Sequence, residues 1–304
     1  MGLRKHGSRH RDGEWTARRR HFGCNAARVV AALVQRSRKV ALAWGESLSM
    51  LVQGIRELSP PVPRLETLTF LPLRGDPING GDARTSSSVL AAGLAEVFGA
   101  SAASLAGTPA VVPRALRTRR AAIRAYAEHA PDFRRIFPAG RLDPAIDCVL
   151  TSVGVPKLAA EPGYGTWSQR FHQTWGCDAL WLARRTYGDI AGVFVPKPGL
   201  DSAAAHELAE AARDWIGPTL ADFRECAARC ATAGGPAGDE PAGSRGDGIS
   251  MPPGMVLIAT GGPLRAQLIL RCCELGLVNT LVVDHELRSE MLALLQPEPP
   301  TTLL

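Results

Sequence analysis

The stretch from Gly254 to Asp284 constrains the fold more than any other part of the chain. Residues 255–259 form an apolar run that predicts a buried strand, and residues 280–283 predict a second one. Between them, Pro263 opens a helical pattern of apolar residues that Gly276 closes, the usual punctuation of a helix. Because so short a strand–helix–strand unit joins parallel strands, we expect a parallel sheet here.

The loop Gly261-Gly262 and Asp284 then follow two neighbouring parallel strands, so they share the carboxyl edge of the sheet, where open α/β sheets bind ligands. Backbone N–H groups at the helix start, with the cation of Arg265, suit an anionic group such as a phosphate. The alternative is a tight turn that packs helix on strand, with Asp284 as a helix cap. We expect ligand contact at all four residues.

The order of elements along the rest of the chain predicts the fold class. Strand-like runs end in glycine-bearing loops, and most are followed by a helical pattern, which predicts an α/β fold: a mostly parallel, Rossmann-like sheet with helices on both faces. The further strands are expected at residues 39–43, 65–73, 145–153 and 188–195. The further helices are expected at 25–35, 48–55, 86–98, 114–129, 178–185 and 202–231, the last interrupted at 217–218.

Length and composition indicate a globular protein of one large or two modest domains. The chain has 304 residues, 45% of them hydrophobic, and no apolar run of the length that spans a membrane. We expect a basic disordered arm at 1–24, a domain at 25–296 and a tail at 297–304. The Gly-, Pro- and Ala-rich tract at 232–253 predicts a flexible loop inside the domain.

Charge is distributed unevenly. Residues 1–40 hold 11 Lys or Arg and two acids, a net charge of +9, whereas the other 264 residues hold 24 Lys or Arg and 27 acids, a net charge of −3. The basic arm either contacts nucleic acid through phosphates or is a solvated tail. Seven cysteines, with no metal-ligand spacing, fit a reducing cytoplasm and predict neither a metal site nor a cofactor.

A series of motifs in the right order resembles the SorC family of transcriptional regulators. The match is to the C-terminal sugar-binding, or effector-binding, domain of that family and covers roughly residues 25–296. It rests on the segments Asn25–Arg28, Val40–Ser47, Ser152–Gly154, Tyr187–Ile190, Ala259–Gly262 and Gly276–Asp284.

The resemblance implies a fold like that of ribose-5-phosphate isomerase, glucosamine-6-phosphate deaminase and CoA transferases. It also implies a phosphorylated sugar as effector, a homo-oligomer in the cytoplasm, and control of carbohydrate genes. DNA contact is expected through the basic arm or through a partner subunit, since the 24 residues before the first matching helix are too few for the helix-turn-helix that usually precedes this domain.

The resemblance adds further ligand candidates: Trp44, Gly45, Ser47, Gly75 and Gly154. Ser47 suits either a phosphate donor or an N-cap, and the loop at Gly75 suits either a second anion cradle or a plain turn.

Two residues depart from the family pattern. Glu46 stands where a basic residue is usual, which opposes a phosphate, and Arg265 replaces a lysine, so it keeps the charge but cannot act as an amine nucleophile. We therefore expect a binding protein and no catalytic residue. The alternatives are an isomerase or deaminase, with Lys157 as the one imine-forming candidate, or a remnant that pairs with a full-length regulator.

Overall fold

The structure, a computed structural model, describes residues 4–76, 83–156, 175–176, 178–232 and 252–296. Six parallel strands form its main sheet in the order β3-β2-β1-β4-β8-β9. In chain order these strands are β1 (Lys39–Leu42), β2 (Thr69–Pro72), β3 (Ser101–Ala102), β4 (Cys148–Thr151), β8 (Gly254–Ala259) and β9 (Thr280–Val283). The α/β class and the parallel sheet predicted from the sequence are confirmed.

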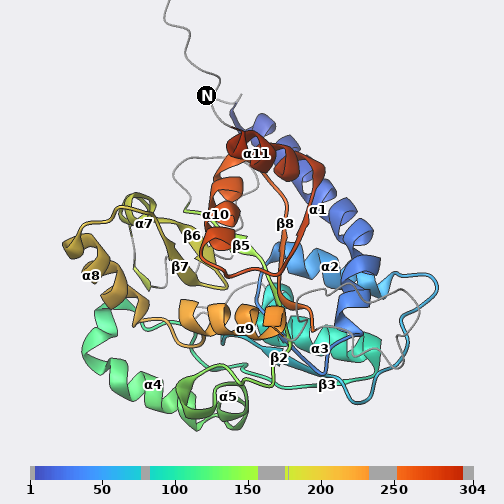
Figure 1. Cartoon of the computed structure of the whole chain (residues 1–304), viewed down its shortest axis with the longest axis horizontal. Coiled ribbons are helices and arrows are strands. Elements are labelled where there is room, and N and C mark those ends of the chain that lie inside the picture. Colours follow the sequence, from blue (N-terminus) through green and yellow to red (C-terminus); the bar gives the residue numbers. More distant parts are fainter. Residues whose placement is uncertain (1–3, 77–82, 157–174, 177, 233–251, 297–304) are drawn as a thin grey trace, which may run out of the picture.

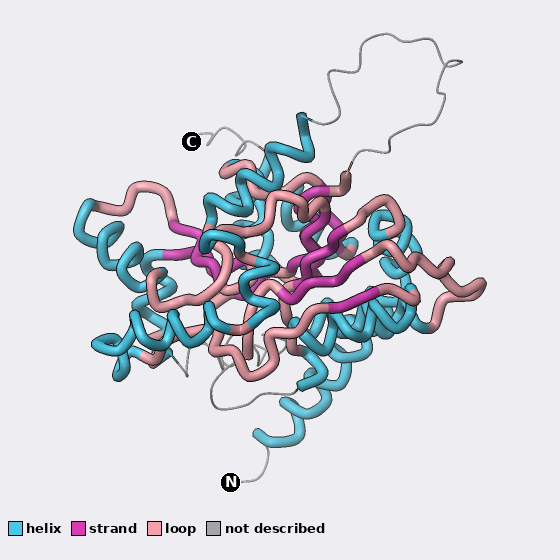
Figure 2. Tube along the Cα trace, turned by 90° about the horizontal axis from the view of Figure 1, so that it is seen from below, coloured by secondary structure: helices cyan, strands magenta, loops and turns pink. Residues whose placement is uncertain are grey.

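Helices flank this sheet (Figures 1 and 2). The connections from β1 to β3 step one way across the sheet and those from β4 to β9 step the other way. Right-handed crossovers therefore place the helices of the two halves on opposite faces. The first half holds α2 (Glu46–Arg56) and α3 (Ser87–Phe98), and the second holds α9 (Leu220–Thr232), α10 (Pro263–Glu274) and α11 (His285–Leu295).

A second, antiparallel sheet of three strands follows β4, made of β5 (Val153–Gly154), β6 (Thr186–Ile190) and β7 (Val193–Pro196). The sequence predicted one strand over 188–195, which is wrong. Ala191 and Gly192 both have positive φ (51° and 76°) and turn the chain into a hairpin. An alanine at such a position gives no turn signal within an apolar run.

The remaining elements form the outer part of the molecule. Two short 3₁₀ turns, η1 (Ala83–Thr85) and η2 (Arg114–Arg119), precede α3 and α4, and a third, η3 (Pro138–Gly140), follows α5. The helices here are α4 (Arg120–His129), α5 (Pro131–Ile136), α7 (Ala179–Arg185) and α8 (Ser202–Ala212).

The N-terminal helix α1 runs from Arg4 to Val34, so the expectation of disorder up to residue 24 does not hold from Arg4 onward. Helix α1 packs along α2. Gly23 and Gly54 meet at the crossing, where a Cβ on Gly23 would lie 2.5 Å from the Met50 carbonyl oxygen. Beyond this crossing Phe22, Ala27 and Val30 enter the core, which fixes the helix.

Some of the expected segments cannot be compared with the structure. The tail at 297–304 and most of the loop at 232–253 lie outside the described residues, as does Lys157. In the described part of the chain, no helix combines the length and the apolar character needed to cross a bilayer.

Candidate functional site

The carboxyl ends of β1 and β4 mark the point where the direction of the connections reverses, the usual ligand position in an open α/β sheet. The two strands are neighbours in the sheet. Gly45 follows β1 with a φ of 128°, and a Cβ there would lie 3.2 Å from the Ser152 hydroxyl oxygen after β4. A glycine thus lets the two loops meet at this switch point.

Helix α2 begins at this point without a side-chain cap. Gly45 is its N-cap, so the alternative of Ser47 as the N-cap is wrong, and Ser47 lies in the first helical turn, half-buried. The Gly45 N–H donates to the Thr85 carbonyl oxygen (3.1 Å), which joins the start of α2 to η1. A helix start without a side-chain acceptor has N–H groups available to an anion.

A cavity of about 540 Å³ runs along α2 from Glu46, at the helix start, to Arg56, and it is closed on its other side by η1 and α3. Its volume falls within the range of small-molecule sites. The polar lining residues are Glu46, Ser49, Gln53, Arg56, Arg84 and Thr85, and the apolar ones are Met50, Val52, Val89, Leu90 and Gly93. Hydroxyl, amide, carboxylate and guanidinium groups over an apolar floor are the chemistry that recognises a polyhydroxylated ligand.

Hydrogen bonds fix the cavity walls. The Ser49 hydroxyl donates to the Arg84 carbonyl oxygen (3.3 Å), and Arg56 pairs with Glu96 of α3 at 2.8 Å. The Gln53 amide donates to Glu57 at 2.6 Å. These contacts join α2 to both η1 and α3, so the cavity has a defined shape before any ligand enters.

The chain is similar to known proteins in both sequence and fold. The family model described as "Putative sugar-binding domain" matches residues 9–240, about three quarters of the chain. The chain belongs to this family. The SorC resemblance of the sequence is thereby confirmed, and no curated protein matches the chain.

Solved structures share the fold of this sugar-binding domain at low sequence identity. A "DeoR family transcriptional regulator" from Listeria monocytogenes has a TM-score of 0.60 and 13% identity, with 90% of this chain and 87% of that chain covered. The full-length sorbitol operon regulator SorC from Klebsiella pneumoniae has a TM-score of 0.60 and 19% identity. The match covers 91% of this chain and 72% of that chain.

A third similar structure comes from Vibrio fischeri, titled "Putative Sugar-Binding Domain of Transcriptional Repressor". Its TM-score is 0.61 at 14% identity, with 92% of this chain and 88% of that chain covered. The expected fold, like that of ribose-5-phosphate isomerase and glucosamine-6-phosphate deaminase, is confirmed by these neighbours.

Trp44 of this sugar-binding domain packs inside the protein. It is 5% exposed, and Gly192 and Trp215 lie in the same cluster: a Cβ on Gly192 would lie 2.8 Å from the Trp44 ring. The indole thus joins the switch point to the small sheet, and its expected role as a ligand contact remains a prediction.

Arg74, which was not among the predicted site residues, also connects the parallel sheet to the hairpin of the small sheet. Its guanidinium donates to the carbonyl oxygens of Ala191 (2.5 Å), Ile216 (2.7 Å) and Pro218 (3.1 Å). It also lies between the rings of Trp44 and Trp215, 5.8 and 5.6 Å from their centroids. Complete burial lowers the pKa of Arg74 to about 9, against the opposing charge of Asp189.

Close packing requires the glycine at Gly75, and the backbone of Gly154 lies against a second such glycine, Gly188. A Cβ on Gly75 would lie 1.8 Å from the Thr108 carbonyl oxygen, so a close approach of two backbone segments requires this glycine, and its expected role in ligand binding remains a prediction. Gly154 lies in β5, opposite Asp189, and its carbonyl oxygen would be 2.1 Å from a Cβ on Gly188. Both glycines therefore shape the backbone near the edge.

The Gly261-Gly262 loop ends β8 at the carboxyl edge, as predicted. Gly262 is the N-cap of α10 and supplies no side-chain cap, so the helix start is open. Arg265 is 8% exposed and donates to the Thr260 carbonyl oxygen, which turns its guanidinium back toward the strand end. The Thr260 hydroxyl is buried and has no hydrogen-bond partner among the described residues.

Asp284 caps α11: its side chain accepts a hydrogen bond from the Leu287 N–H at 3.0 Å. Its other oxygen accepts from Arg18 of α1 at 2.9 and 2.5 Å. The cap alternative is confirmed, and both carboxylate oxygens are used within the protein.

Several residues of the cavity went unnoticed in the sequence. Gln53 and Arg84 carry no local motif, and only the packing of α2 against η1 and α3 brings them together. Glu46, which the sequence indicated only as an obstacle to phosphate, is also one of the residues that line the cavity.

Proposed function

We propose that this sugar-binding domain is the effector-binding part of a transcriptional regulator, and that a phosphorylated sugar binds at the start of α2. The observation that carries the proposal is the cavity lined by Ser49, Gln53 and Arg84, which opens next to the switch point of a sheet of the sugar-binding family. The titles of structural neighbours from three organisms describe transcriptional regulators or repressors.

In this proposal the phosphate lies against the first turn of α2. The open N–H groups of that turn and the Ser47 hydroxyl supply donors, and the sugar hydroxyls enter the cavity toward Gln53 and Arg84. Trp44, which follows β1, and the Gly261-Gly262 loop, which follows β8, lie at the same carboxyl edge of the sheet. Glu46 weakens phosphate binding through charge repulsion and so tunes the affinity.

Binding without turnover fits the carboxylates near the edge. Asp284 is held by Arg18 and the Leu287 N–H, and Asp189 accepts from the Gly192 N–H at 2.8 Å. Neither is poised to take a proton from a substrate. We propose in addition that the protein acts as a cytoplasmic homo-oligomer and controls carbohydrate genes, with DNA contact through its N-terminal segment or a partner subunit.

Titration calorimetry with matched probes tests the proposal. We expect at least one of fructose 6-phosphate, ribose 5-phosphate and glucosamine 6-phosphate to bind, and the corresponding free sugar to bind at least tenfold more weakly. Arg84→Ala and Gln53→Ala should each weaken binding roughly tenfold, the cost of losing one hydrogen bond to a charged or polar partner. Arg288→Ala, an exposed arginine on α11, is the matched control.

Glu46→Gln should raise the affinity for the phosphorylated probe and leave the affinity for the free sugar unchanged. If all three phosphosugars fail to bind, or if Arg84→Ala and Gln53→Ala bind like the parent, the proposed site is wrong. Turnover of a phosphosugar would support the enzyme alternative instead.

A further inference from the structure

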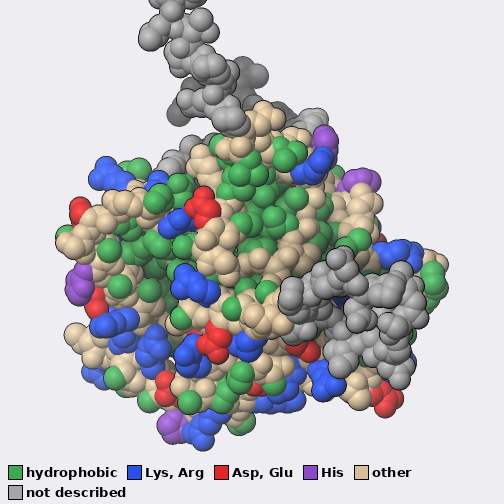
Figure 3. All heavy atoms as spheres, in the orientation of Figure 1, with side chains coloured by type: hydrophobic (Ala, Val, Ile, Leu, Met, Phe, Trp, Pro, Cys, Tyr) green, Lys and Arg blue, Asp and Glu red, His purple; other side chains and the backbone are tan. Residues whose placement is uncertain are grey.

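The segment from η2 to Arg141 is strongly basic. Residues 114–141 contain eight arginines, no lysine and two acids, so this segment alone carries +6, the net charge of the whole chain. In Figure 3, Lys and Arg side chains gather over α4 and α5 at the lower left of the molecule, with fewer acidic ones between them.

Three of these arginines contact groups of the protein interior and so attach the segment to the rest of the fold. Arg117 and Arg120 pair with the fully buried Asp214 at 2.5 and 2.6 Å. Arg124 donates to the carbonyl oxygens of Arg213 (2.8 Å) and Trp215 (2.7 Å). Their charges are used internally, and they hold η2 and the start of α4 rigidly against the Trp215 region.

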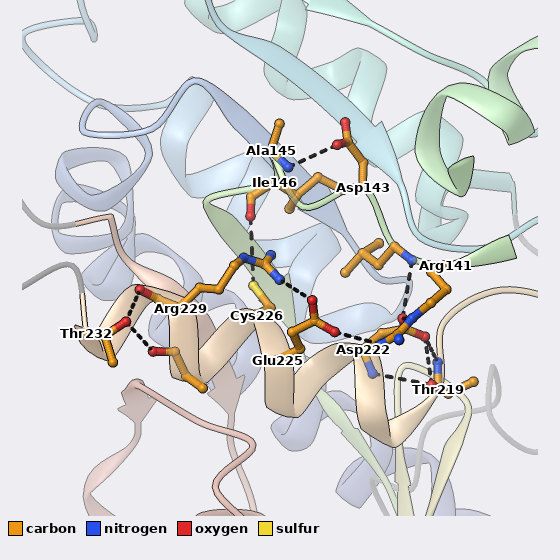
Figure 4. A network of polar contacts seen from close by, with 12 residues as sticks. Arg141, Asp143, Ala145, Ile146, Thr219, Asp222, Glu225, Cys226, Arg229 and Thr232 are labelled. Atoms are coloured by element: carbon orange, nitrogen blue, oxygen red, sulfur yellow. Dashed lines mark hydrogen bonds and ion pairs between the residues drawn. The ribbon is translucent and has the colours of Figure 1, made fainter. Parts of the chain in front are cut away.

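A fourth, Arg141, is neutralised at the edge of the segment. Figure 4 shows its guanidinium pointing to Asp222 and Glu225 of α9, at 3.4 and 2.6 Å. Arg141 therefore ties the segment to α9 and adds little to its outward charge.

The outer arginines are exposed, and one of them, Arg134, also donates through its Nε to the Glu128 carbonyl oxygen at 2.9 Å. They are Arg119, Arg134 and Arg135, and none of them takes part in an ion pair within the described part of the chain. Of the two acids, Asp132 accepts from the Ser104 N–H at 2.8 Å, and only Glu128 is exposed on α4.

Between the outer arginines, the exposed side of α4 carries mostly small, uncharged side chains. The outer side of α4 presents Ala121, Ala122 and Ala125, with Tyr126 exposed by 68%. A ten-residue helix is about 15 Å long, so Arg119 at its start and the Arg134-Arg135 pair past its end are separated by several phosphate spacings of a nucleic acid strand.

We propose that this face, Arg119–Arg135, binds the phosphate backbone of double-stranded DNA without reading its sequence. Arginine forks match phosphate oxygens, and small side chains between them let a strand approach closely. A protein partner or a membrane needs bulky apolar groups at its centre, and this face offers alanines and a single tyrosine. The proposal rests on the proposed role in transcription, and it adds a contact to DNA beyond the N-terminal segment.

Fluorescence anisotropy with a labelled 25-base-pair duplex of arbitrary sequence tests the face. We expect binding at 50 mM salt that weakens strongly at 200 mM. The triple variant R119Q/R134Q/R135Q should bind at least about tenfold more weakly at 50 mM, and its log–log salt slope should be smaller by about 2–3, as expected for three lost phosphate contacts. R38Q/R64Q/R288Q removes three exposed arginines elsewhere and should change the affinity less than twofold.

Sugar binding by calorimetry shows that the triple variant is folded and separates the two proposals. Loss of DNA binding with sugar binding intact supports the face. If the triple variant binds the duplex like the control, or if the parent binds no duplex at 50 mM salt, the proposal is overturned. Equal binding of phosphatidylserine vesicles or polyglutamate would also overturn it, since the face would then recognise negative charge of any kind.

Discussion

Arg18 and Asp284 join the first helix to the last strand of the sheet. Two nitrogens of the Arg18 guanidinium contact one Asp284 oxygen at 2.9 and 2.5 Å, and a third reaches Glu286. The other Asp284 oxygen caps α11. These contacts raise the pKa of Arg18, although its partial burial opposes them. One carboxylate thus holds two elements that lie at opposite ends of the sequence.

Removing this carboxylate should cost stability. We expect Asp284→Ala to lower the free energy of unfolding by about 1–2 kcal/mol, because it loses a helix cap and an ion pair, and Arg18→Ala to lower it by at most about 1 kcal/mol. Urea denaturation of both variants and of the double variant gives the coupling between the two residues. If Asp284→Ala is as stable as the parent yet loses sugar binding, Asp284 is a ligand contact after all.

Arg74 should be the most sensitive cation in the fold. Arg74→Met keeps a similar length but leaves three buried carbonyl oxygens without a donor and Asp189 without its cation, so we expect a loss of about 3–5 kcal/mol. Thermal and urea unfolding measure it. Arg288→Met is the matched exposed control and should be neutral; similar stability in the two variants would contradict the role of Arg74.

Asp189 should give stability a distinct pH dependence. Burial raises the pKa of its carboxyl to about 6, against the Gly192 N–H and the Arg74 cation, which favour the charged form. The folded protein then holds a proton that the unfolded chain releases between about pH 4 and 6, so this group favours folding at low pH. That contribution, up to about 3 kcal/mol, is lost as pH rises through 6.

Asp189→Asn still presents an oxygen to the Gly192 N–H but cannot titrate. Urea midpoints from pH 4 to 7 should therefore fall less steeply for Asp189→Asn than for the parent. Parallel curves for the two proteins would show that Asp189 does not titrate in this range.

Two glycines that the sequence assigned to one ligand site should behave differently. Gly75→Ala places a methyl group against the Thr108 backbone, and we expect a loss of about 3 kcal/mol or more. Gly262→Ala meets nothing within 4 Å and should cost less than about 1 kcal/mol. Circular dichroism and urea unfolding compare them, and weaker sugar binding by a stable Gly262→Ala would support the ligand role of that loop.

Local signals predicted much of the fold. Pro263, Gly276 and two apolar runs located β8, α10 and β9 within a residue, because each boundary depends on nearby residues. The hairpin at Ala191 was missed because its one turn signal, Gly192, lies inside a continuous apolar run that predicts a single strand. The start of α1 was missed as well, because its basic composition resembles a disordered arm, and the contacts that fix the helix come from α2 and from Asp284, far away in the sequence.

The carboxyl edge of the sheet was predictable from the sequence, but the cavity was not, because none of the residues predicted as ligand contacts lines it. Glycines and strand ends located the carboxyl edge. Whether Asp284 or Arg265 points to a ligand or to the protein depends on partners such as Arg18 and the Thr260 carbonyl oxygen, which only the folded chain brings close. The cavity beside α2 depends in the same way on how two helices pack.

The buried guanidinium of Arg74 has a mechanical consequence for any signal that a ligand sends. Arg74, just past β2, binds the Ala191 carbonyl oxygen of the hairpin and the Ile216 and Pro218 carbonyl oxygens between α8 and α9, and it lies between two indole rings, so the junction of the two sheets is a poor hinge. The helix that the proposed ligand would contact, α2, packs on its other side against α1. Movement would then pass along the N-terminal helix, while the two sheets turn together as one rigid block.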